Sequence, residues 1–311
     1  MQETLRKISF ALPLVAVGVA LAASATKPAH AEDDATEKRE RCATRVSIAL
    51  LGKSAAPALL AAANPQDSVD AMLADPAFIE RFAGFTNRRF NPEPGTNVAE
   101  DASYTLSKYI LENKKPWKEL FIGAYDVADA VTTDAAGLGY FRSDAWMRRF
   151  AGNELAGYRL PAAYRILQNT TGLELMATTN VDGVDLSATG RQAKECKGCH
   201  FDNWYALDKV ARVLSRRQGT GKNMKFLAPT DGPQSILGGK TISDDSQLVN
   251  ALVTTEEFKV NVCRLAFNYL YGRNENSCEA QVFDRCIDAF TKDQTMQSAL
   301  SVVAKDPAFC Q

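Results

Sequence analysis

The segment Cys196-Lys197-Gly198-Cys199-His200 has the residue types and the spacing that attach a haem covalently. In a Cys-x-x-Cys-His sequence, the two thiols add to the two vinyl groups of a haem, and the histidine that follows binds the iron from one side. The motif therefore predicts one haem c, with Cys196 and Cys199 as the thioether anchors and His200 as the proximal iron ligand.

Three other interpretations of these cysteines are weaker. A dithiol redox site normally opens a helix directly after a buried strand, whereas the preceding segment, residues 186–195, is polar and contains glycine. A zinc site needs further ligands, and the chain has no second Cys-x-x-Cys and no histidine pair. A structural disulfide between Cys196 and Cys199 leaves the adjacent His200 unexplained. The spacing thus favours haem attachment.

The sixth iron position is left open by the sequence. The chain has two histidines, and because His30 lies in the segment expected to be removed, His200 is the only one in the mature chain. Two histidines of one chain therefore cannot both bind the iron. Met224 is the first candidate for the sixth ligand and Met176 the second, while a non-methionine donor, water or an open position is equally compatible. The remaining internal methionines lie in helical patterns and are expected in the core: Met72, Met147 and Met296.

Residues 1–31 read as a cleaved signal peptide. Arg6 and Lys7 precede an uncharged, mostly apolar run over residues 8–23, and the segment ends in the small-residue pattern of residues 29–31. An uncleaved membrane anchor is the alternative, but this run is shorter than the ~20 residues of a spanning helix. The mature chain is then expected to be periplasmic or secreted and not membrane-spanning. Its 33 basic and 36 acidic side chains give no indication of nucleic-acid binding.

Five cysteines lie outside the motif: Cys42, Cys263, Cys278, Cys286 and Cys310. In an exported protein they are expected to form disulfides, and their odd number allows two bridges and one free thiol. A helical hairpin turning near residue 274 places Cys263 opposite Cys286, and a third helix returns Cys310 towards Cys278. These two bridges are predicted, with Cys42 as the free thiol.

The apolar periodicity predicts a mainly α fold in three parts. Residues 32–185 form a helical N-terminal region, residues 186–243 a small cytochrome c-like haem segment, and residues 244–311 an antiparallel bundle of three to four helices. Within the haem segment, a helix is expected over about residues 203–217. Three arginines on it, Arg212, Arg216 and Arg217, are candidates to pair with haem propionates.

Several local sequences resemble the planctomycete-type cytochrome c families, helical haem-bearing exported proteins of unknown function. The resemblance spans residues 67–310 and rests on Leu73-Ala74-Asp75-Pro76 with Phe82, Lys118-Glu119-Leu120-Phe121 within Tyr109–Phe121, the order of Cys196–His200, Gly238-Gly239, Phe258 and Ala266–Arg273, and the terminal Asp306-Pro307-Ala308-Phe309. It implies a helical, secreted haem protein, and it implies no particular substrate.

The expected function is single-electron transfer to redox partner proteins by a periplasmic monohaem c-type cytochrome. The first alternative is a haem-dependent oxidoreductase or sensor whose sixth iron position is open. A peroxidase usually has a histidine above the iron as acid–base group, and the mature chain has none to spare. The second alternative is a structural or binding subunit of an envelope complex, in which haem stabilises the fold.

Overall fold

The computed structural model describes residues 29–91, 101–150, 159–175, 183–219, 223 and 225–311. Contacts divide the chain after Glu37, and residues 38–311 form one compact unit. Residues 1–28, which make up most of the predicted signal peptide, lie outside the described residues. Within the described ranges, no helix combines the length and the apolar character needed to span a membrane.

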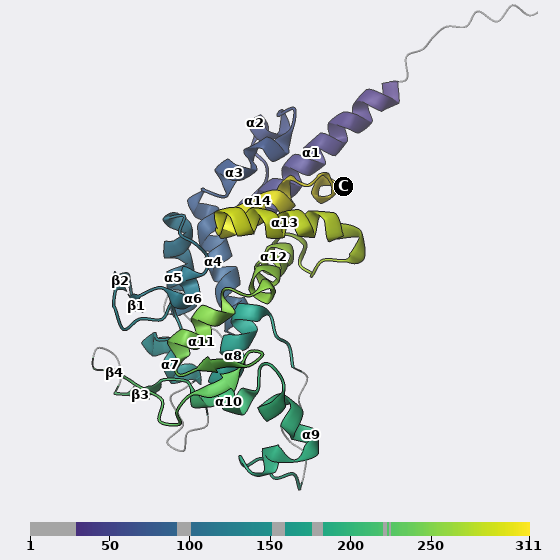
Figure 1. Cartoon of the computed structure of the whole chain (residues 1–311). Coiled ribbons are helices and arrows are strands. Elements are labelled where there is room, and N and C mark those ends of the chain that lie inside the picture. The colour runs from purple at the N-terminus through teal and green to yellow at the C-terminus, as the bar shows by residue number, and fades with distance from the viewer. Residues whose placement is uncertain (1–28, 92–100, 151–158, 176–182, 220–222, 224) are drawn as a thin grey trace, which may run out of the picture. The chain divides into compact units, whose positions relative to one another are not determined.

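The chain is mainly helical, as predicted (Figure 1). The helices before the motif are α1 (Ala29–Leu51), α2 (Pro57–Leu60), η1 (Pro65–Ser68), α3 (Val69–Met72), α4 (Pro76–Phe90), α5 (Ala102–Glu112), α6 (Glu119–Ile122), α7 (Asp144–Phe150) and α8 (Leu160–Thr171). Three short antiparallel hairpins are the sheets of the described chain: β1 (Tyr125–Val127) with β2 (Val131–Thr133), β3 (Arg216–Gln218) with β4 (Lys225–Leu227), and β5 (Gln234–Ile236) with β6 (Lys240–Ile242).

Aromatic side chains join distant parts of the sequence in the core. Asp75 caps α4 by accepting a 2.7 Å hydrogen bond from the amide of Ala77, and Pro76 follows at the first helical position. The helix then buries Phe78 and Phe82, whose rings contact Tyr269 edge to face with centroids 5.9 and 4.9 Å apart. These contacts pack α4 against α12 (Glu256–Tyr271).

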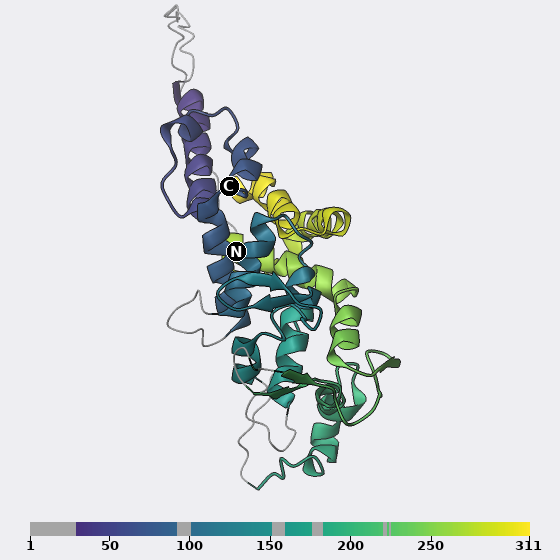
Figure 2. The same ribbon diagram turned by 90° about the vertical axis from the view of Figure 1, so that its left-hand side faces the viewer.

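The C-terminal helices begin and end where the sequence indicates. Thr255 caps α12 by accepting from the amide of Phe258, and Gly272 ends it in the left-handed conformation at φ 71°. α13 (Ala280–Asp293) and α14 (Met296–Lys305) follow, and the three helices contact one another pairwise. α11 (Asp245–Leu252) precedes them and packs on α8. Figure 2 shows the same unit from the side, with α13 and α14 again next to each other.

Two disulfides cross-link the unit, and one of them differs from the prediction. Cys263 and Cys286 join α12 to α13 with their Cα atoms 6.0 Å apart, which confirms that bridge. The predicted Cys278–Cys310 bridge is wrong, since Cys310 pairs with Cys42 of α1 and Cys278 is free and exposed. The reason is that the chain after α14 forms the short helix η7 (Pro307–Cys310), which meets α1 and not the turn before α13.

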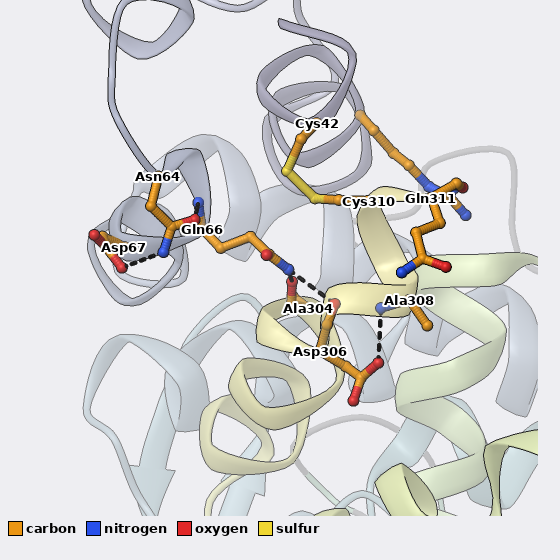
Figure 3. The surroundings of a disulfide bond; sticks show 10 residues. Cys42, Asn64, Gln66, Asp67, Ala304, Asp306, Ala308, Cys310 and Gln311 are labelled. Carbon is orange, nitrogen blue, oxygen red and sulfur yellow. Dashed lines mark hydrogen bonds between the residues drawn. A yellow bond between two sulfur atoms is a disulfide. The ribbon is translucent and has the colours of Figure 1, made fainter. Parts of the chain in front are cut away.

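Hydrogen bonds support this junction of the two ends of the unit (Figure 3). The side-chain amide of Gln66 donates to the carbonyls of Ala304 and Asp306 at 2.7 and 2.9 Å, so that η1 is held against the end of α14. Asp306 caps η7 by accepting from the amide of Ala308 at 2.9 Å. The Cys42–Cys310 bridge therefore lies in a junction that is also closed by hydrogen bonds between side chains and the main chain.

Candidate functional site

The Cys-x-x-Cys-His motif lies on a short irregular helix. The chain runs from η3 (Gly190–Gln192) into α9 (Lys194–Lys197) and then into the π turn η4 (Gly198–Asp202), where the amide of Asn203 donates to the carbonyl of Gly198 at 2.9 Å. α10 (Leu207–Arg212) follows and packs on α8. Turns of π geometry occur often at functional sites, because they displace a side chain from the regular helical register.

The two motif cysteines are accessible and unpaired. Cys196 is half-buried and Cys199 is exposed, and neither forms a disulfide. They lie three residues apart across the junction of α9 and η4 and belong to successive turns of one helical segment. The cysteines of the motif are thus available to an external group, as haem attachment requires.

His200 is held by a buried carboxylate. Its Nδ1 lies 2.7 Å from Oδ2 of Asp208, which is on the first turn of α10. Asp208 also accepts two hydrogen bonds from Arg191, at 2.9 Å from Nε and 2.6 Å from Nη2. The side chains of Arg191 and Asp208 are only 7% and 8% exposed. A third bond of Arg191, from Nη1 to the carbonyl of Leu186, fixes the guanidinium on the preceding loop.

The charge of Asp208 determines which nitrogen of His200 carries the proton. Burial by itself raises the pKa of the Asp208 carboxyl, but hydrogen bonds from His200 and Arg191 outweigh this effect and hold the pKa at about 2. An ionised carboxylate only accepts hydrogen bonds, so the Nδ1 of His200 must be the donor. In the neutral imidazole, Nε2 then keeps its lone pair, which is the form that binds a metal.

The other motif neighbour is Tyr205. Its hydroxyl lies 3.3 Å from Sγ of Cys199 and accepts a 3.0 Å hydrogen bond from the side-chain amide of Asn203. The phenol is largely buried, and this burial raises its pKa above the ordinary value. Tyr205 therefore remains a neutral phenol beside Cys199.

Exposed apolar side chains surround the motif in sequence. Val184, Leu186 and Trp204 are 43%, 50% and 40% exposed, and of the large apolar side chains in the described chain only Ile48 is comparable. Trp204 stacks edge to face on Tyr205 at 5.3 Å. Large apolar groups gathered on a surface mark sites where an apolar partner binds. A porphyrin would be such a partner, and Leu186 and Trp204, which flank the motif in sequence, would offer it exposed apolar surface.

A metal ion bound only by side chains finds less support. Among the described residues, no group of three or more His, Cys, Asp and Glu side chains is arranged to hold a metal. Haem iron differs in this respect, because the porphyrin supplies four nitrogen ligands and the protein needs to supply only one or two. His200 alone meets that requirement.

The other predicted site residues lie outside the described residues or on elements other than the motif helix. Met224 and Met176 lie outside the described residues, and Met72, Met147 and Met296 are buried in the core as expected. The helix expected over residues 203–217 is shorter, since α10 covers only Leu207–Arg212. Arg216 and Arg217 lie instead on β3, where Arg217 pairs with Phe226 of β4.

Asp208 and Arg191 are the site residues that sequence reasoning missed. A signal was present, because Asp208 follows His200 by eight residues and lies between Leu207 and Val210, on a helix expected to bury its apolar side chains. A buried acid in such a pattern needs a partner. The sequence did not identify Arg191 as that partner, since the bond spans a loop and two helical turns.

No family model, curated protein or solved structure matches the chain.

Proposed function

We propose that this protein is an exported c-type cytochrome that carries one haem c on Cys196, Cys199 and His200 and passes single electrons to partner proteins. The observation that carries the proposal is the state of the motif: two unpaired, accessible thiols stand beside a histidine whose Nδ1 is occupied by a buried carboxylate. Iron-binding histidines generally have their second nitrogen bonded in this way.

The residues divide the work of holding the haem. Cys196 and Cys199 would hold the haem through thioether bonds, each thiol adding its sulfur to one carbon of a vinyl group and its hydrogen to the other, with no net oxidation. His200 offers Nε2 to the iron, and Asp208 holds the imidazole in place. Trp204 and Leu186 provide apolar surface. When bound, the haem supplies a couple between ferrous and ferric iron.

Two further observations support export and a cytochrome. The Cys42–Cys310 and Cys263–Cys286 bridges suit an oxidising compartment, as does the signal-peptide pattern of residues 1–31. A c-type haem is attached after export, and so these features agree with one another.

The test is expression in bacteria that mature c-type cytochromes, with export to the periplasm. We expect the purified chain to retain haem after denaturing electrophoresis and to give the pyridine spectrum of two thioether bonds. His200→Ala should abolish the normal low- or high-spin c-haem spectrum. A chain without covalent haem, in cells that load a control cytochrome, would contradict the proposal.

The spectrum in both redox states separates electron transfer from the alternatives. Ligation by methionine, with Met224 as the first candidate and Met176 as the second, favours electron transfer. High-spin iron that binds added small molecules favours an oxidoreductase or a sensor with an open sixth position. A haem that cannot be oxidised and reduced without unfolding the chain favours a structural subunit of an envelope complex.

A further inference from the structure

We infer that Asp208 and Arg191 act as a pair of positioning residues that set the reduction potential of the iron through His200. The inference rests on the proposed haem function and deepens it. It starts from a shared atom: Oδ2 of Asp208 accepts from Nδ1 of His200 at 2.7 Å and from Nε of Arg191 at 2.9 Å. The imidazole and the guanidinium therefore compete for one carboxylate.

Stability alone gives little reason for this arrangement. Burying an ion pair removes both charges from water, and this loss often equals or exceeds the attraction between them. Arg191 and Asp208 are nonetheless almost fully buried, next to a surface whose apolar side chains are exposed. A pair of charges held at this place is better explained by its action on His200.

A second arginine–aspartate ion pair in the same unit shows how the Arg191–Asp208 pair differs. Arg142 and Asp245 also form a close ion pair, at 2.6 Å, with side chains 16% and 8% exposed. Asp245 accepts in addition from the amide of Ser215 at 3.3 Å. Asp245 thus bonds to Arg142 and to a backbone amide, whereas Asp208 bonds to Arg191 and to the imidazole of the motif. The Arg142–Asp245 pair is a matched control.

The chemistry fixes the sign of each effect. A carboxylate that accepts from Nδ1–H raises electron density on the imidazole and makes Nε2 a stronger donor. A stronger donor stabilises ferric more than ferrous iron, so Asp208 lowers the reduction potential. Arg191 draws electron density from the same carboxylate and adds positive charge, so it raises the potential. The two residues act in opposite directions.

The decisive experiment compares three variants of the haem-loaded full chain. Asp208→Asn keeps the shape and removes the charge, and we expect the ferric-to-ferrous equilibrium to shift towards ferrous by roughly tenfold, the lower end of the effect of such partners on metal sites. For one electron this is about +59 mV. Arg191→Gln should shift the potential downward, and Asp245→Asn should leave it unchanged. The iron–histidine vibration should weaken in Asp208→Asn and strengthen in Arg191→Gln.

A readout without haem keeps the two proposals distinguishable. In the full-length chain produced without haem, the nitrogen chemical shifts of His200 should report the Nδ1–H tautomer, and Asp208→Asn should give a mixture of tautomers. An unchanged tautomer in Asp208→Asn would overturn the inference whether or not haem binds. Shifts of equal sign in the Asp208 and Arg191 variants would overturn it too, since that result indicates simple loosening. A wild-type chain with the expected tautomer but no covalent haem would refute the cytochrome and leave the positioning of His200 intact.

Discussion

Two pairs of cysteines in this protein have opposite surroundings. Cys263 and Cys286 are fully buried, lie on the facing helices α12 and α13, and are bridged. Cys196 and Cys199 lie three residues apart on one irregular helical segment, are accessible, and are unpaired. The first pair is surrounded by core and the second by exposed apolar side chains and a histidine. The same residue type thus stabilises one region and is available for chemistry in the other.

The difference teaches how to separate structural from reactive cysteines. A buried bridge between two helices restricts the unfolded chain and takes part in packing. An accessible pair contributes little to packing, so its local arrangement needs another reason. Here that reason is supplied by His200 and by the buried Asp208 that orients it. Removing each pair in turn by alanine substitution tests this contrast.

The largest expected effect is complete loss of covalent haem on removal of the accessible pair. In Cys196→Ala with Cys199→Ala no thiol of the motif remains to form a thioether, and haem staining after denaturing electrophoresis should disappear. The matched control is Cys278→Ala, which removes another exposed free cysteine and should retain full staining. Equal staining of the double variant and the control would show that the motif does not attach haem.

The second prediction concerns the bridged cysteines, whose removal should lower stability and leave haem attached. Cys263 and Cys286 are 23 residues apart in the sequence. Loss of their bridge by alanine substitution should therefore lower the free energy of unfolding by about 3 kcal/mol. The Cys42–Cys310 bridge spans a separation of 268 residues, and its loss should lower this free energy by about 5 kcal/mol. Urea unfolding monitored by circular dichroism measures both changes.

The order of these two effects is the sharper part of the prediction. If the Cys263–Cys286 variant were the less stable one, packing of the buried sulfurs would outweigh the length of the closed loop. Haem staining of the folded variants is the control. Loss of staining in either folded variant would contradict the separation between structural and reactive cysteines.

Many of the helices could be predicted from the sequence, because local signals determine where they begin and end. Thr255 and Gly272 begin and end α12 as their chemistry indicates, and the facing of Cys263 and Cys286 followed from one short turn. The pairing of Cys42 with Cys310 could not be predicted in this way. It depends on where η7 meets a helix 268 residues earlier, and no local pattern encodes such a contact.

The candidate site divides in the same way. The motif was identified from its residue types and spacing alone, and its haem chemistry stays a prediction. The bond between Arg191 and Asp208 was not predicted, because it joins the short helix η3 to α10, and the length of α10 was overestimated by several residues. Sequence reasoning therefore named the side chains proposed to hold a haem and missed the buried charges that orient His200.

The smallest expected effect lies in the turn that closes the bridged hairpin. Glu279 accepts from the amide of Asn276 at 2.9 Å, completing a capping box, and pairs with Arg273 at 2.6 Å. The ion-pair hydrogen bond with Arg273, helped by the amide of Asn276, lowers the pKa of Glu279 below its ordinary value. A lowered carboxyl pKa contributes stability above the unfolded pKa of about 4.3, and this stability is lost as the pH falls through the folded pKa.

Glu279→Gln should therefore destabilise the chain at pH 7 and have progressively less effect below about pH 4. Because Arg273 is 46% exposed, the difference should stay below about 1 kcal/mol. Urea unfolding at pH 7 and pH 3, with both disulfides intact, measures it. Haem staining should be unchanged, since this turn belongs to the bridged hairpin. Equal stabilities of the two chains at both pH values would assign the role of Glu279 to helix capping by a hydrogen bond that glutamine also provides, and not to its charge.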